Sequence, residues 1–75
     1  LIDIFSNSVV SLEEAENLLV VKTLSGTAHA AASAIDAMSN NMILGTIAGD
    51  DTILVIVKDT EQAEIVKKEI TQLIK

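Results

Sequence analysis

The chain has 75 residues, enough for one small domain, and a monomer of this size buries only about 60% of its unfolded surface. Apolar residues make up 49% of the sequence, with one aromatic and no cysteine, so an aliphatic core forms without disulfides or thiolate metal sites. The net charge is −6, and residues 1–57 carry seven acids against one lysine, which argues against phosphate binding and favours a small cationic partner. No apolar run reaches the roughly 18 residues of a membrane span and no signal-like segment is present, so we expect a cytoplasmic location.

The N-terminal part predicts two strands joined by a polar connection. Residues 3–11 mix β-branched and polar side chains, as is typical of an irregular strand. Residues 11–17 lack a helical apolar period, so we interpret them as a polar connection, although Ser11 and Glu14 resemble a capping box. Residues 18–24 are largely apolar and predict the second strand.

A helix is predicted from Ala28 to about Asn40. The preceding Ser25-Gly26-Thr27 supplies a turn and a hydroxyl that can cap the helix. An apolar stripe follows helical spacing through Ala28, Ala31, Ile35, Met38 and Met42. The opposite, polar stripe consists of His29, Ser33, Asp36 and Asn40. His29 and Asp36 should therefore share one helix face, about 10 Å apart along the axis.

Two further strands, residues 42–48 and 52–57, meet at Gly49-Asp50-Asp51. The strand over 52–57 does not alternate apolar with polar residues, which predicts that both of its faces are covered. A last helix follows, capped by Asp59 or Thr60, with apolar residues at helical spacing: Ala63, Val66, Ile70 and Leu73.

The predicted order is β-β-α-β-β-α, in a single domain over residues 1–75. We expect an α+β, two-layer sandwich with a four-stranded, mainly antiparallel sheet and two helices on one face. The uncovered face would still be apolar in the second and fourth strands. We therefore expect the sheets of several copies to pack together.

The adjacent carboxylates of Asp50 and Asp51 allow two interpretations. Aspartate is common in hairpin turns, so the pair can be a polar turn. Alternatively, the pair recognises a guanidinium or ammonium group, since a carboxylate accepts a guanidinium through two parallel hydrogen bonds. Neighbouring side chains of an extended chain point in opposite directions, so one aspartate can serve its own copy and the other a neighbour.

His29 and Asp36 are weaker candidates for chemistry. They are typical of a solvated helix face, and one histidine at i, i+7 spacing without cysteine makes a poor metal site. As an acid–base pair they lack an identifiable nucleophile. Gly45 and Gly49 do not form a phosphate loop, and we expect them to allow close approach of a neighbour or ligand.

A resemblance to a known family rests on the centre of the chain. Its motifs are Thr23-Leu-Ser-Gly-Thr-Ala-His-Ala30, Ala34-Ile-Asp36 and the long run Gly45-Thr-Ile-Ala-Gly-Asp-Asp-Thr-Ile53. From about Val9 to the last helix, the chain resembles the C-terminal domain of the bacterial arginine repressor family. The resemblance implies a β-β-α-β-β-α sandwich that forms trimers, which stack into hexamers with L-arginine bound between trimers.

The resemblance also implies roles for individual residues. Asp50 and Asp51 match the acidic pair that holds arginine, including its guanidinium, across subunits. Asp36 matches the helix carboxylate that binds the α-amino end of the ligand. His29 lies where members of that family carry Gln or His, as a polar contact to arginine.

Thr46 and Ala48 match the strand whose side chain and backbone complete this pocket. Ser25 departs from the family pattern, in which many members have proline before the glycine, and we expect it to alter the stiffness of the turn rather than the site. The ligand-binding residues implied by the resemblance are His29, Asp36, Thr46, Ala48, Asp50 and Asp51.

The function implied is that of an effector-sensing and oligomerisation domain of an arginine-responsive transcriptional regulator. L-arginine would be its co-repressor ligand, with no cofactor, metal or catalytic residue. The family's N-terminal winged-helix DNA-binding domain is absent from this sequence, so we expect this domain alone to bind neither operator DNA nor membranes. Two alternatives stay open: a ligand-free oligomerisation module, and a small α/β enzyme that uses His29 with a carboxylate.

Overall fold

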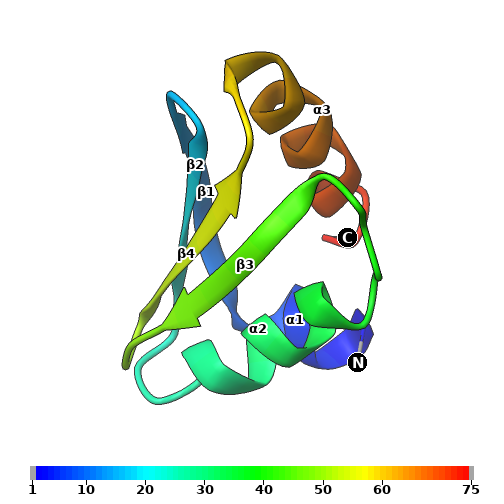
Figure 1. Cartoon of the computed structure of the whole chain (residues 1–75). Coiled ribbons are helices and arrows are strands. Elements are labelled where there is room, and N and C mark those ends of the chain that lie inside the picture. Colours follow the sequence, from blue (N-terminus) through cyan, green and yellow to red (C-terminus); the bar gives the residue numbers. More distant parts are fainter. Residues whose placement is uncertain (1, 75) are drawn as a thin grey trace.

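A four-stranded antiparallel sheet with helices on one side of it makes up the chain (Figure 1). The computed structural model describes the backbone of residues 2–74 and the side chains of residues 5–74. Its elements follow the order α1 (Ile2–Ser8), β1 (Val9–Ala15), β2 (Leu18–Thr23), α2 (Ala28–Asp36), β3 (Ile43–Ala48), β4 (Thr52–Val57) and α3 (Thr60–Thr71). None of the described helices is both long and apolar enough to cross a membrane. The predicted α+β sandwich is confirmed, with an additional helix at its N-terminal end.

The strands lie in the order β1-β2-β4-β3, so β2 and β4 are central and carry the most apolar sequences. Alternate residues of these two strands face the helices and are buried: Leu19, Val21, Thr23, Ile53, Val55 and Val57. The other residues of β4 are only half-buried, so one chain covers β4 fully on a single face. β-Branched residues favour a strand whether one or both of its faces are buried. The apolar run therefore predicted the strand correctly but not the number of its buried faces.

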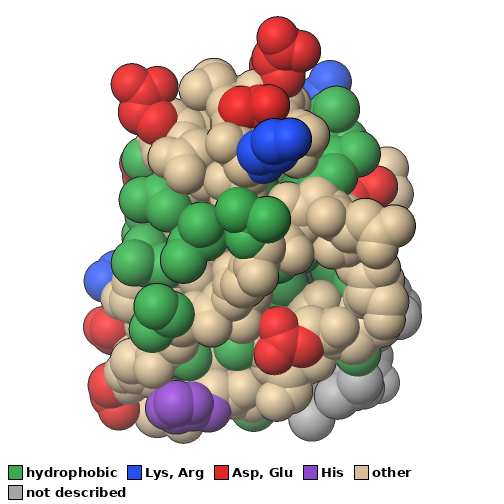
Figure 2. Space-filling model, viewed as in Figure 1, with side chains coloured by type: hydrophobic (Ala, Val, Ile, Leu, Met, Phe, Trp, Pro, Cys, Tyr) green, Lys and Arg blue, Asp and Glu red, His purple; other side chains and the backbone are tan. Residues whose placement is uncertain are grey.

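The face of the sheet that lacks helices is rich in aliphatic side chains. Leu18, Val20, Leu54 and Ile56 lie on it and are half-buried. On the edge strand β3, Leu44 is 67% exposed and Ile47 is 62% exposed. Figure 2 shows hydrophobic side chains gathered over the sheet on the β3 side of the molecule. A single chain therefore leaves an extensive apolar surface in contact with water.

The helices α2 and α3 bury their predicted stripes. In α3, Asp59 is the N-cap, and its Oδ1 accepts a hydrogen bond from the backbone N–H of Gln62 at 2.8 Å. In α2 the buried residues include Ala28, Ala31 and Ile35. The predicted hydroxyl cap of α2 is wrong, because the Thr27 hydroxyl donates to the Leu24 carbonyl at 2.6 Å instead.

The helix α2 ends at Asp36, four residues earlier than predicted. The chain then turns through Ser39, whose φ of 53° interrupts the helical path. Met38 and Met42 continue to pack against the core from this irregular connection. The predicted apolar stripe therefore identifies Met38 and Met42 correctly as residues that pack against the core, although both lie beyond the end of α2.

The predictions for the first 17 residues are wrong in two places. Residues 2–8 form α1 instead of a strand, and the side chain of Phe5 is completely buried in the core. The predicted polar connection is mostly strand β1, and only the turn at Glu16 and Asn17 joins it to β2. Strand β1 lies at the edge of the sheet, where charged side chains are tolerated. Its glutamates interrupt the apolar pattern, so the sequence did not indicate a strand there.

Candidate functional site

The hairpin between β3 and β4 presents Asp50 and Asp51 at its tip, and both are exposed. The main chain of this tip is held by the connection between β2 and α2. The N–H of Thr23 donates to the Asp51 carbonyl at 2.7 Å. The N–H groups of Gly26 and Ala28 donate to the Asp50 carbonyl at 3.1 and 3.3 Å. Three backbone hydrogen bonds therefore fix the position from which the two carboxylates project.

Each of the two carboxylates accepts a hydrogen bond from a neighbouring hydroxyl on one oxygen. The Ser25 hydroxyl donates to Oδ2 of Asp50 at 2.9 Å, and the Thr52 hydroxyl donates to Oδ1 of Asp51 at 2.9 Å. Within residues 5–74, the second oxygen of each carboxylate has no protein hydrogen-bond donor. Each carboxylate is thus held through one oxygen, and its second oxygen stays available to a ligand.

The contact with Ser25 corrects the expectation that this residue affects only the turn. Its hydroxyl touches a carboxylate of the candidate site directly. Gly26, which follows it, has a φ of 80°, a conformation that glycine adopts at no steric cost and that confirms the predicted sharp turn. The turn brings the hydroxyl and Asp50 together although 25 residues separate them in sequence.

A lysine accompanies this acidic pair. The Nζ of Lys22 lies 3.9 Å from Oδ1 of Asp51 and donates to the Thr52 hydroxyl at 2.9 Å. Among the residues whose side chains the structure describes, this is the single ion pair. Sequence reasoning missed the contact, although Lys22 was visible as the one base among the first 57 residues.

A second polar group forms at the opposite end of α2. The Thr46 hydroxyl on β3 donates to Oδ1 of Asp36 at 2.9 Å. Asp36 is the last residue of α2, where a negative charge is unfavourable by about 0.3–1 kcal/mol because the helix carbonyls point toward it. Its charge therefore does not stabilise the helix, and the Thr46 hydroxyl offsets part of the cost.

Within the described part of the chain, the candidate residues lie in separate groups along α2. Asp50 lies beside Ala28, the first residue of α2, and Asp36 ends this helix eight residues later, which corresponds to about 12 Å of helix axis. His29 is exposed near the start of that helix, and Ala48 is half-buried at the end of β3. The structure thus joins Asp36 to Thr46 and places the two tip carboxylates together, but it leaves these groups apart.

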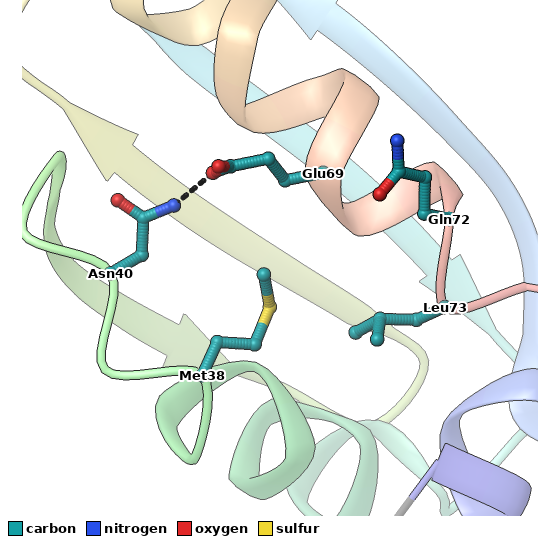
Figure 3. A pocket seen from close by; sticks show the side chains of 5 residues that line it. All are labelled: Met38, Asn40, Glu69, Gln72 and Leu73. Carbon is teal, nitrogen blue, oxygen red and sulfur yellow. Dashed lines mark hydrogen bonds between the residues drawn. The ribbon is translucent and has the colours of Figure 1, made fainter.

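A hollow between the α2–β3 connection and α3 contains none of these six residues (Figure 3). Asn40 spans it by donating a side-chain hydrogen bond to Glu69. Its lining consists of Met38, Asn40, Glu69, Gln72 and Leu73. Throughout the described residues, no group of three or more His, Cys, Asp or Glu side chains is arranged to hold a metal ion.

Comparison with known proteins places these residues in a family. Residues 5–72 match the family model described as arginine repressor, C-terminal domain. A protein named arginine repressor from Alkaliphilus metalliredigens is 48% identical over 75 residues, covering 100% of this chain and 50% of the relative. Two others with that name, from Alkaliphilus oremlandii and Clostridium tetani, are 59% identical over 58 residues and 58% identical over 69 residues. These two alignments cover 77% and 91% of this chain, and 39% and 45% of the respective relatives.

The chain therefore spans about half the length of the curated relatives that it matches. The matched region contains both aspartates of the hairpin tip, Asp36 and the contacts between them and their neighbours. The chain belongs to the family of arginine repressor C-terminal domains.

Proposed function

We propose that this domain binds L-arginine between copies of the chain and that the bound arginine stabilises a hexamer. The observation that carries the proposal is the pair of exposed carboxylates at the hairpin tip, each held on one oxygen and open on the other. The guanidinium group of arginine carries planar N–H donors that form charge-assisted hydrogen bonds to carboxylate oxygens. Family membership supports the same ligand.

In this proposal the site is shared between subunits. Asp50 and Asp51 supply one half, and Asp36 with Thr46 supplies the other half from a different copy. The separation of these groups along α2 supports the division, because the start and the end of this helix lie about 12 Å apart along its axis. His29 and Ala48 would complete the surroundings of the ligand.

The helix-free face of the sheet supports the assembly. Its exposed Leu44 and Ile47 adjoin the half-buried aliphatic residues of β2 and β4. Surfaces of this kind are covered by partners in stable proteins. We propose that copies pack through this face as trimers and that two trimers form the hexamer.

Arginine would act through differential binding. The acidic residues of facing copies repel one another, and a bound cation that bridges them removes this repulsion only in the assembled state. A ligand that binds one assembly state better shifts the population toward it. The same reasoning predicts that arginine stabilises the chain most at low salt, where charges are least screened.

For the parent protein, we propose a cytoplasmic regulator of the transcription of arginine-metabolism genes. Operator DNA would be bound by a winged-helix domain outside these 75 residues, since the net charge of −6 disfavours nucleic-acid binding here. No catalytic role is proposed. The relatives carry the name of a repressor, and His29 is exposed without a side-chain hydrogen bond within the described part of the chain.

The test is isothermal titration of the chain with L-arginine, alongside sedimentation velocity with and without the ligand. Replacing Asp50 or Asp51 by asparagine should weaken binding by about 10- to 150-fold, the range of a lost charge-assisted hydrogen bond. Glu61→Gln, on the exposed face of α3, makes the same change in net charge and should bind normally.

Citrulline, which is neutral where arginine is charged, should bind far more weakly than arginine. Absence of arginine binding to the unsubstituted chain would refute the proposal. Equal affinities in the two aspartate variants and in Glu61→Gln would refute the assigned site.

A further inference from the structure

The side chain of Lys22 makes the cationic contact that the structure records at the hairpin tip. We propose that Lys22 is a tethered competitor of the cationic ligand at Asp51 and thereby sets the affinity of this half of the site. The inference rests on the proposed function, and it assigns to Lys22 a regulatory role toward that same site.

The sheet register creates the contact. Lys22 on β2 pairs with Thr52 on β4, so their side chains lie side by side on the helix-free face. The ammonium donates to the Thr52 hydroxyl at 2.9 Å, and this hydroxyl donates to Oδ1 of Asp51 at 2.9 Å. The ammonium itself lies 3.9 Å from the same oxygen. Lys22 is thus anchored beside Asp51 by a residue that also contacts the carboxylate.

The contact is weak enough to be exchanged. The side chains of Lys22 and Asp51 are 49% and 53% exposed, and 3.9 Å is longer than a hydrogen bond. Exposed ion pairs of this kind change an equilibrium constant by a factor of about 1.4 to 5. A guanidinium that forms two parallel hydrogen bonds to the carboxylate is the stronger partner. The ligand therefore displaces Lys22, and its affinity is reduced by the strength of the contact that it replaces.

The effect should be specific to this lysine. Lys58 follows the opposite end of β4, six residues beyond Thr52, or about 20 Å of extended chain. This separation exceeds the Debye length of about 8 Å at physiological ionic strength, so Lys58 has little influence on Asp51. Lys22→Met and Lys58→Met change the net charge equally, which makes the second variant a matched control.

The experiment measures arginine affinity by isothermal titration in the unsubstituted chain and in Lys22→Met, Lys22→Gln, Lys22→Arg and Lys58→Met. Sedimentation and circular dichroism compare the assembly and folding of the variants. We expect Lys22→Met and Lys22→Gln to bind arginine about two- to fivefold more tightly than Lys58→Met does. We expect Lys22→Arg to bind no more tightly than the unsubstituted chain, because a guanidinium at this position competes at least as well.

Equal affinities of Lys22→Met, Lys22→Gln and Lys58→Met would overturn the inference and leave the proposed function intact. Weaker binding by Lys22→Met and Lys22→Gln than by Lys58→Met would also overturn it, since Lys22 would then support the ligand. If the unsubstituted chain binds no arginine, the proposed function fails, and the inference fails with it.

Discussion

The hydrogen bond from Thr46 to Asp36 gives a quantitative prediction for Thr46→Val. Valine has nearly the shape of threonine and suits a strand, so the substitution removes the hydroxyl and little else. A hydrogen bond to a charged group contributes about 1.5–3 kcal/mol. Asp36 is exposed and Thr46 is half-buried, so water replaces part of this contribution and we expect a loss of about 1 kcal/mol.

For a domain of this size, about 1 kcal/mol corresponds to a decrease in Tm of roughly 4–8 °C. The measurement is thermal and urea unfolding followed by circular dichroism, without arginine and at one protein concentration, because the proposed assembly would make the apparent stability concentration-dependent. A double-mutant cycle with Asp36→Ala isolates the pair.

In the Asp36→Ala background, the valine substitution should cost almost nothing, since the acceptor is already gone. The reasoning would be refuted if Thr46→Val lowered the free energy of unfolding equally in both backgrounds. That result would mean that Asp36 gains nothing from the hydroxyl, and its cost at the end of α2 would be unopposed.

Two further predictions concern the scaffold. Phe5→Ala should destabilise the chain by about 3–5 kcal/mol because Phe5 is completely buried. The control Val10→Ala, at a residue that is 64% exposed, should change stability little. Urea unfolding measures both variants, and similar losses would show that α1 is not part of the core. Asp59→Ala should lower the free energy of unfolding by about 1 kcal/mol, because it removes the N-cap of α3. Asp59→Asn keeps an accepting oxygen and should lower it less. Equal losses of the two variants in thermal unfolding would argue against capping.

The second half of the fold was predictable because the local sequence patterns there favour the same elements that the packed structure contains. The apolar run of β4, the cap at Asp59 and the helical spacing of Ala63, Val66 and Ile70 each indicate one structure, and the chain adopts it. At the N-terminal end the local signals are weak. Phe5 makes residues 2–8 a helix by entering the core, and pairing with β2 makes a strand of the glutamate-rich segment.

The candidate site shows the same division. The sequence by itself determined that two carboxylates stand together between apolar strands, and that Asp36 lies on a helix with His29. These features depend on residue type and on spacing within one element, which local chain geometry controls.

Only the tertiary structure decided which neighbours those carboxylates have. The hydroxyl of Ser25 and the ammonium of Lys22 reach the hairpin tip because the β2–α2 turn and the β2–β4 register bring them there. These contacts span 25 and 29 residues, and no sequence pattern within either segment specifies its partner in the other. Distant segments come together because they bury a common hydrophobic core, and this packing determines which side chains lie next to the two aspartates.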